Sequence, residues 1–169
     1  MKSLKFGIAA IAMVLVLAVP PASAGDDDRE GRQGLAGTWY VKLVPQDCIT
    51  GTPFPIPPIP TLFTFHGDGT LSATLENYAA SLTNRSLSHG IWKRISDRRP
   101  GVYTMKFTHL RYDFISGVYM GTQEAVSQVT LDWNGNKFTA ASSTRGFDPT
   151  GAQQYSSCAS LSGERMQLP

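Results

Sequence analysis

Short segments of alternating apolar and polar residues, separated by turn sequences, constrain this chain to a β-rich fold. Gly67-Asp68-Gly69 and Asn134-Gly135-Asn136 are hairpin sequences of this kind, and no segment keeps a helical period. Eight strands are expected, over residues 37–44, 62–65, 71–75, 90–95, 102–113, 125–133, 138–140 and 154–166. We therefore predict an all-β protein, an eight-stranded antiparallel up-and-down barrel in one domain.

Two segments interrupt this pattern. Residues 45–60 are rich in proline, which lacks the N–H that a β-ladder needs, so we expect a loop outside the sheet. Its prolines beyond the first are Pro53, Pro55, Pro57, Pro58 and Pro60. Residues 79–88 are expected to form a short helix or a loop.

The first 24 residues have the features of a secretory signal peptide. Lys2 and Lys5 precede an apolar stretch over residues 8–19, and Ala22-Ser23-Ala24 has the small residues of a cleavage site. The stretch of 12 residues is shorter than the about 20 that cross a bilayer. We predict cleavage after Ala24, a periplasmic or secreted protein, and no membrane span.

Cleavage would make the chain formally neutral. Of the 15 lysines and arginines, two lie in the predicted signal peptide, which leaves 13 against 13 acidic residues. Nucleic acid is therefore not an expected partner, because binding to phosphates needs a cationic surplus. Residues 25–34 are charged and lack a buried pattern, so we expect a disordered tail followed by a barrel domain over residues 35–169.

Cys48 and Cys158 are the two cysteines, and disulfides persist in exported proteins. The first and last strands of a closed barrel are neighbours, so we predict a disulfide between them. Two free thiols or a metal pair are the alternatives, but zinc usually takes four ligands and none lie near either cysteine in the sequence. The three histidines are also widely spaced, so no metal site and no cofactor are expected.

Gly37-Thr38-Trp39 opens the first predicted strand, and Arg165 lies in the last. An indole face attracts a cation, so the two side chains can stack. With the eight-strand layout, these residues resemble the lipocalin and calycin superfamily, in particular small exported bacterial members. The resemblance implies that Trp39 lies across the closed end of the barrel against Arg165. The second and third sequence motifs of that family are not evident.

Residues 102–113 carry the strongest candidates for an interior site. Alternation places Tyr103, Met105 and Phe107 in the barrel, with His109 and Arg111 near its rim. The alternative is that Arg111 forms a surface pair with Glu124 or Asp113. The residues that we expect to line a ligand cavity are Phe63, Phe65, Trp92, Tyr103, Met105, Phe107, Arg111 and Glu124.

The small residues over 140–143 allow two interpretations of the barrel interior. Placed against the aromatic Phe63, Phe65 and Trp92, they either fill the taper of the barrel or leave a cavity beneath its mouth. The sequence does not decide between a packed interior and a container.

Three functions are compatible with these features. The first is an exported carrier of a small hydrophobic ligand. The second is a protein-binding barrel, such as a protease inhibitor, that uses residues 25–34 and 53–60 as contacts. The third is a cyclase or isomerase of the allene-oxide-cyclase type, for which Glu124 and Asp113 are the candidate acids. No nucleophile motif is present, so no catalytic residue is assigned and an enzyme is the less favoured prediction.

Overall fold

A computed structural model describes residues 34–75, 83–96 and 101–168. The predicted signal peptide and nearly all of the predicted charged tail lie outside these residues. The strands are β1 (Gly37–Gln46), β2 (Ile59–Phe65), β3 (Thr70–Leu75), β4 (Thr83–Arg85), β5 (Ser88–Ser96), β6 (Val102–Asp113), β7 (Tyr119–Leu131), β8 (Lys137–Phe147) and β9 (Gln153–Arg165).

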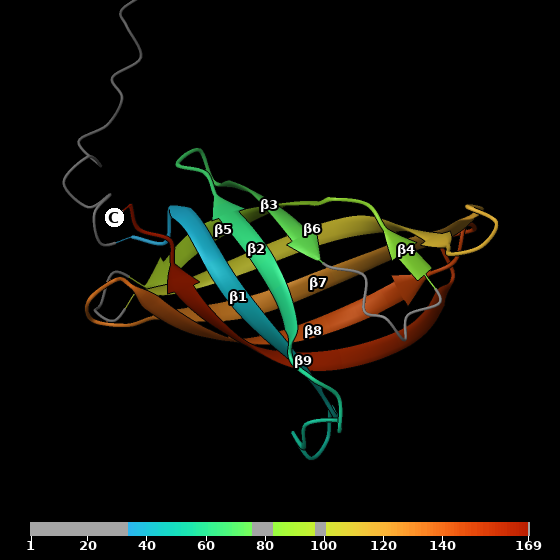
Figure 1. Ribbon diagram of the computed structural model, residues 1–169, viewed down its shortest axis with the longest axis horizontal. Helices are drawn as coiled ribbons and strands as arrows, with labels where there is room; N and C mark the ends of the chain where they lie inside the picture. The colour runs from blue at the N-terminus through green and yellow to red at the C-terminus, as the bar shows by residue number, and fades with distance from the viewer. Residues whose placement is uncertain (1–33, 76–82, 97–100, 169) are drawn as a thin grey trace, which may run out of the picture.

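Eight of these strands form one closed antiparallel barrel (Figure 1). Its ring order is β1-β2-β3-β5-β6-β7-β8-β9, and β9 pairs with β1 to close it. The short β4 continues the line of β5 along β6. The predicted all-β barrel is therefore confirmed, and the described residues contain no helix. Within the described residues, no helix has the length and hydropathy needed to cross a membrane.

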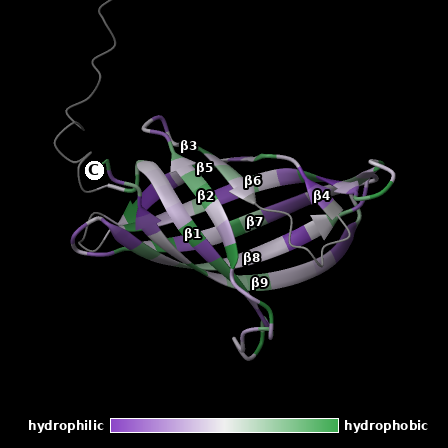
Figure 2. Ribbon diagram, in the orientation of Figure 1, coloured by the Kyte–Doolittle hydropathy of each residue, from purple (hydrophilic) through white to green (hydrophobic). Residues whose placement is uncertain are grey.

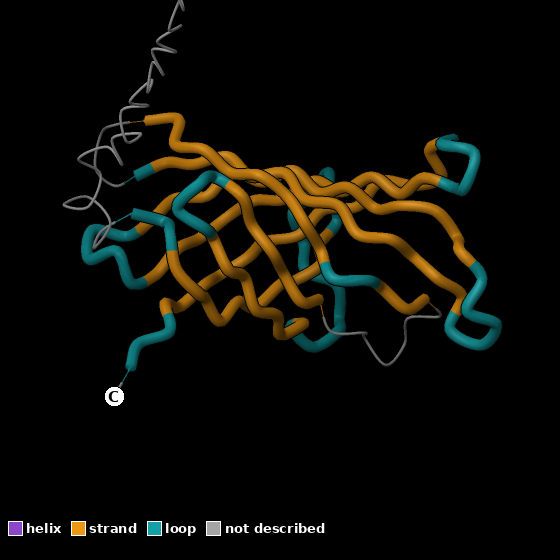
Figure 3. The backbone as a smooth tube through the Cα atoms, turned by 90° about the horizontal axis from the view of Figure 1, so that it is seen from above, coloured by secondary structure: helices purple, strands orange, loops and turns teal. Residues whose placement is uncertain are grey.

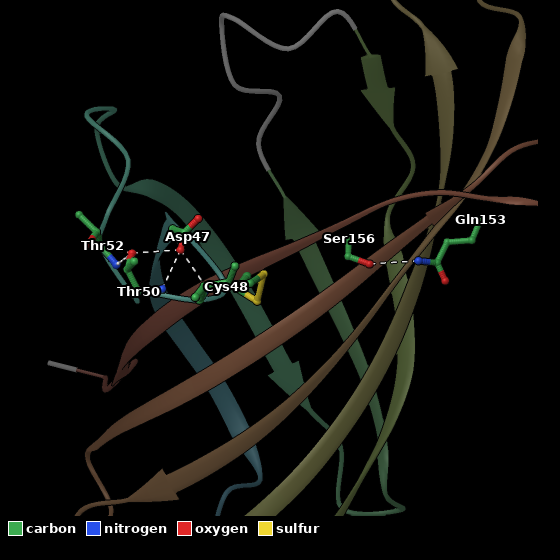
Figure 4. The surroundings of a disulfide bond; sticks show 8 residues. Asp47, Cys48, Thr50, Thr52, Gln153 and Ser156 are labelled. Atoms are coloured by element: carbon green, nitrogen blue, oxygen red, sulfur yellow. Dashed lines mark hydrogen bonds between the residues drawn. A yellow bond between two sulfur atoms is a disulfide. The ribbon is translucent and has the colours of Figure 1, made fainter.

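The seam between β1 and β9 joins the two ends of the barrel sequence. Its register runs from Trp39 opposite Arg165 to Gln46 opposite Cys158. Cys158, from the last of these pairs, forms a disulfide with Cys48, which follows the end of β1 (Figure 4). This confirms the predicted bridge. The seam is therefore fastened by side chains at both of its ends.

Several element boundaries differ from the sequence prediction. Pro45 and Pro60, expected in a loop, lie in β1 and β2, opposite Ala159 and Lys42. Each is at or near a strand end, where one missing N–H removes little of the ladder. β7 begins six residues earlier than expected, because Gly121 lies inside the strand, next to a bulge in β7 opposite Arg111 and Tyr112, rather than in a turn.

Apolar and polar residues alternate as bands along the strands (Figure 2), and the apolar ones form a buried core. We call the end of the barrel that holds Trp39 the closed end. Trp39 is fully buried there, and its Nε1 donates to the Leu35 carbonyl over 2.9 Å. Its ring makes an edge contact with Phe138, with 5.0 Å between ring centroids. The closed end is thus packed with large side chains.

Arg165 covers the outer side of this packing. Its guanidinium carbon lies 4.3 Å from the Trp39 ring centroid, and its nitrogens donate to the carbonyls of Gly34, Ala36 and Gly135. A Cβ on Gly37 would lie 2.7 Å from Arg165 Nη1, so the first glycine of the motif makes room for the guanidinium. The stack closes the barrel floor.

The other end of the barrel, which we call the open end, carries the β6–β7 and β8–β9 connections (Figure 3). The strands that lead to it turn smaller side chains inward. Ala125, Ser127, Ala140, Ser142 and Ala159 are all buried. Together they widen the interior above the aromatic floor.

Candidate functional site

A cavity of about 100 Å³ lies in the half of the barrel nearer the open end. It is small beside the roughly 300–1,000 Å³ of pockets that hold drug-sized ligands, so it fits a small group or one end of a molecule. Its apolar walls are Leu43, Pro45, Ile59, Phe107, Ala125 and Ala159. Its polar lining comprises Arg85, His109, Gln123, Ser142, Thr144 and Ser157, and Cys158 completes it.

A row of side chains crosses four strands at the top of this cavity. His109 Nε2 lies 3.2 Å from Gln123 Oε1, and the Tyr155 hydroxyl donates to the same oxygen over 3.0 Å. Tyr155 reaches Gln123 by lying across Gly146, where an added Cβ would be 2.2 Å from the ring. We call His109, Gln123 and Tyr155 the polar row.

His109 is held neutral in this row. It is 2% exposed, and its pKa is lowered from 6.5 to about 4, mainly by burial. The charge of Arg85 contributes to this lowering, and so does Arg111 to a smaller extent, while the Gln123 hydrogen bond opposes them. Because Gln123 Oε1 only accepts, His109 carries its proton on Nε2, which leaves Nδ1 to face the Ser88 hydroxyl at 3.5 Å.

Arg111 points into the barrel rather than onto its surface. It is 8% exposed, and its Nη2 donates to the carbonyls of Met120 and Phe147 over 3.2 and 3.0 Å. Its guanidinium carbon lies 5.1 Å from the Tyr155 ring centroid. Its Nε is buried without a hydrogen-bond partner among the described residues. Arg111 therefore braces the rim and adds positive charge beside the polar row.

Arg85 is the cross-strand partner of Arg111, on β4. Two like charges directly opposite each other oppose folding. Burial lowers the pKa of Arg85; Tyr155 opposes this effect, and Arg111 adds to it. A guanidinium nevertheless keeps its proton, so both arginines remain cationic.

The two candidate acids do not face the interior. Glu124 lies on the outer face of β7, where its carboxylate pairs with Lys106 at 3.1 Å and Arg145 at 3.6 Å. Asp113 accepts hydrogen bonds from the Ile115 and Ser116 backbone amides in the turn after β6. The alternative pairing of Arg111 with either acid is therefore not present.

The other residues predicted for the cavity occupy two levels of the barrel. Phe107 lines the cavity itself. Phe63, Phe65, Tyr103 and Met105 are buried below it in the apolar core. Trp92 packs against that core, and its Nε1 donates to the carbonyls of His66 and Thr70.

The Ser88 hydroxyl faces the His109 imidazole as a nucleophilic serine faces its general base. The surroundings of the two side chains do not suit that chemistry. Ser88 is fully buried, so its hydroxyl is closed to a substrate. Gln123, which holds the other side of the imidazole, carries no charge to stabilise an imidazolium. The described residues also contain no group of three or more side chains placed to hold a metal ion.

Several residues of the site were not identified from the sequence, among them Arg85, Gln123 and Tyr155. Arg85 lies in the segment expected to be a short helix or loop, Gln123 falls before the expected start of its strand, and Tyr155 lies near the start of the last strand. Strand register brings them together, and only the period-two pattern of β6 indicated that His109 and Arg111 face this end.

Comparison with known proteins adds no relative to this picture. No protein-family model matches the chain, and no curated protein matches it. The function must therefore be argued from the barrel and its cavity.

Proposed function

We propose that this chain is an exported, calycin-like barrel that binds a small amphipathic molecule at its open end. The observation that carries the proposal is the cavity of about 100 Å³ between the apolar core and the polar row. An apolar part of the ligand would pack against Leu43, Ile59 and Phe107, and a polar part would face Gln123 and the inward hydroxyls. This division of apolar walls and few polar groups is typical of small-molecule sites.

The pattern of a signal peptide over residues 1–24 supports export, and the Cys48–Cys158 disulfide is compatible with an oxidising compartment. The barrel topology and the Trp39–Arg165 stack support the calycin-like assignment. Fold alone does not specify a ligand, so the assignment rests on the cavity.

Native mass spectrometry of residues 25–169, purified from an exporting host without detergent, tests the proposal. We expect an adduct that survives gentle ionisation and leaves when the protein unfolds. Ala125→Leu should remove it, because the larger side chain fills the cavity. Ala141→Leu is the matched control, since Ala141 is exposed on the outer face of β8. An adduct retained by Ala125→Leu, or no adduct after incubation with host lipid extract, would contradict the proposal.

Protein binding is a second candidate function, favoured by the β1–β2 connection. This connection projects from the barrel (Figure 1), and the disulfide at Cys48 ties its base. Asp47 Oδ1 accepts hydrogen bonds from the Ile49 and Thr50 amides, while Ile49 and Phe54 remain exposed. Such a constrained loop loses little entropy on binding. Inhibition of a serine, a cysteine or a metalloprotease that Phe54→Ser abolishes would support this function over the first.

A further inference from the structure

We propose that the end of the β6–β7 hairpin docks the barrel onto a zwitterionic lipid surface. This hairpin ends at the open end of the barrel (Figure 1), and five large apolar side chains are exposed within seven residues of it. We call this set the apolar tip; its members are Phe114, Ile115, Val118, Tyr119 and Met120. The inference goes beyond the proposed ligand binding and does not depend on it.

The apolar tip is the densest group of exposed apolar side chains in the described chain. Ile115 is 92% exposed, and Phe114 and Val118 are each 61% exposed, so these side chains pack little against the barrel. No other stretch of seven described residues exposes five large apolar side chains. Single exposed apolar residues are ordinary, whereas a contiguous group marks a surface that contacts a partner or a membrane.

The turn beneath the apolar tip satisfies its own polar groups. Asp113 Oδ1 accepts hydrogen bonds from the amides of Ile115 and Ser116 and from the Ser116 hydroxyl. The Gly117 amide donates to the Asp113 carbonyl over 3.0 Å, and the Val118 amide donates to the Ser116 hydroxyl over 3.4 Å. A backbone amide without a partner is costly in lipid, because no water is present to replace it. These four consecutive amides therefore need no water when the tip enters lipid.

The charge around the apolar tip selects the kind of lipid surface. The sequence from Phe114 to Gln123 contains no charged residue, and Asp113 is the charged residue that directly precedes it. Hydrogen bonds from the Ser116 amide and hydroxyl lower the pKa of the Asp113 carboxyl, so it is ionised at neutral pH. A negative charge is attracted by the ammonium group of a zwitterionic headgroup and repelled by an anionic headgroup. We therefore expect a zwitterionic surface.

Two tyrosines lie at the base of the apolar tip. Tyr112 of β6 and Tyr119 of β7 have ring centroids 5.9 Å apart. A tyrosine combines an apolar ring with a polar hydroxyl, which suits the boundary between lipid and water. Farther along the hairpin, Glu124 pairs with Lys106 and Arg145 on the outer face. The hairpin therefore passes from apolar side chains through amphipathic rings to charged pairs, as expected for a segment that enters lipid only at its end.

A second copy of the chain fits the apolar tip less well than lipid does. A stable protein–protein interface buries about 800 Å² on each partner and uses roughly 20–30 residues a side. The apolar tip has five residues, on the end of a hairpin. A fluid lipid surface can surround such a convex end, whereas a protein partner would need a groove shaped to receive it.

The test is flotation of residues 25–169, with the disulfide formed, on two kinds of vesicle at pH 7. One kind is phosphatidylcholine, and the other is phosphatidylcholine and phosphatidylglycerol in equal parts. Residues 1–24 are omitted because their apolar stretch would itself bind lipid. We expect the protein to float with the phosphatidylcholine vesicles and to bind the anionic vesicles more weakly. Phe114→Ser combined with Ile115→Ser should lower partitioning at least about tenfold, since burying either side chain contributes about that factor.

Trp133→Ser is the matched control. Trp133 is 66% exposed, much like Phe114, but it lies between β7 and β8 at the closed end. We expect this substitution to leave partitioning unchanged. Ile115→Trp provides a second readout, because brominated phosphatidylcholine should quench its emission beyond any quenching of the unmodified protein. A Tm like that of the unmodified protein would establish that each variant is folded.

The outcomes separate this inference from the proposed function. No flotation on phosphatidylcholine, or flotation that survives the Phe114→Ser, Ile115→Ser pair, would overturn the inference. Binding to the anionic vesicles at least as tight as to phosphatidylcholine would overturn the zwitterionic surface. A dimer without lipid that the same pair of substitutions dissociates, together with no flotation, would assign the apolar tip to a second copy instead. Each of these results leaves the adduct in native mass spectrometry, and so the proposed ligand binding, to be judged separately.

Discussion

Truncation of Trp39 to alanine tests the closure of the barrel floor. The indole is fully buried, it meets Phe138 edge-on, and its Nε1 donates to a buried carbonyl. Buried Trp→Ala substitutions cost about 3–5 kcal/mol through lost transfer energy and the cavity left behind. The unsatisfied Leu35 carbonyl and the lost stack with Arg165 favour the upper part of that range. We therefore expect the free energy of unfolding to fall by about 4 kcal/mol.

Urea denaturation monitored by far-ultraviolet circular dichroism measures this change, and thermal unfolding provides a second readout. For a domain of this size, about 4 kcal/mol corresponds to a fall in Tm of more than about 10 °C. Trp133→Ala is the control, because Trp133 is 66% exposed and should change stability by less than about 0.5 kcal/mol. Equal, small effects of the two substitutions would refute the assignment of Trp39 as the plug of the closed end.

Three further predictions concern the open end and the seam. The pKa of His109 is about 4 when folded and 6.5 when unfolded, so the unfolded state binds more protons between these values. Stability should fall by about 3 kcal/mol as pH falls through this window, and His109→Gln should remove that slope in pH-dependent denaturation. Gly146→Ala should cost about 1–3 kcal/mol by displacing Tyr155, whereas Gly67→Ala, in open space, should be nearly neutral in the same assay. Reduction of the disulfide, which closes a separation of 110 residues, should lower stability by up to about 4.7 kcal/mol; an unchanged Tm in reductant would contradict this.

The barrel was predictable because its signals are local. Asn134-Gly135-Asn136 specifies the hairpin between β7 and β8, and the alternation over Val102–Asp113 indicates which side chains of β6 face inward. The disulfide could be expected because strand order makes the ends of the chain neighbours. Each of these inferences needs only a short window of sequence or the ring order of strands.

The site was less predictable because its members meet through register. The Tyr155 hydroxyl donates a hydrogen bond to Gln123 Oε1 although 32 residues separate the two in the sequence. Glu124 was expected to face the cavity, but it is one residue after Gln123, and the period of two turns it outward. Arg85 lies in a three-residue strand, which is too short to produce a recognisable pattern. An alternating sequence pattern shows which residues of a strand share a face, but it does not show which residues of the neighbouring strands lie opposite them.

The β1–β9 seam has a consequence for how the chain reaches its native state. Contacts across it span more than a hundred residues, as the pairing of Trp39 with Arg165 shows, whereas the hairpins of the ring are local. Non-local pairings of this kind slow folding, because the ends of a long chain must first be brought together. The barrel therefore remains an open sheet with two unpaired edges until β9 is available. Once the disulfide has formed, it holds those edges within reach, so we expect the oxidised chain to refold faster and to aggregate less than the reduced chain.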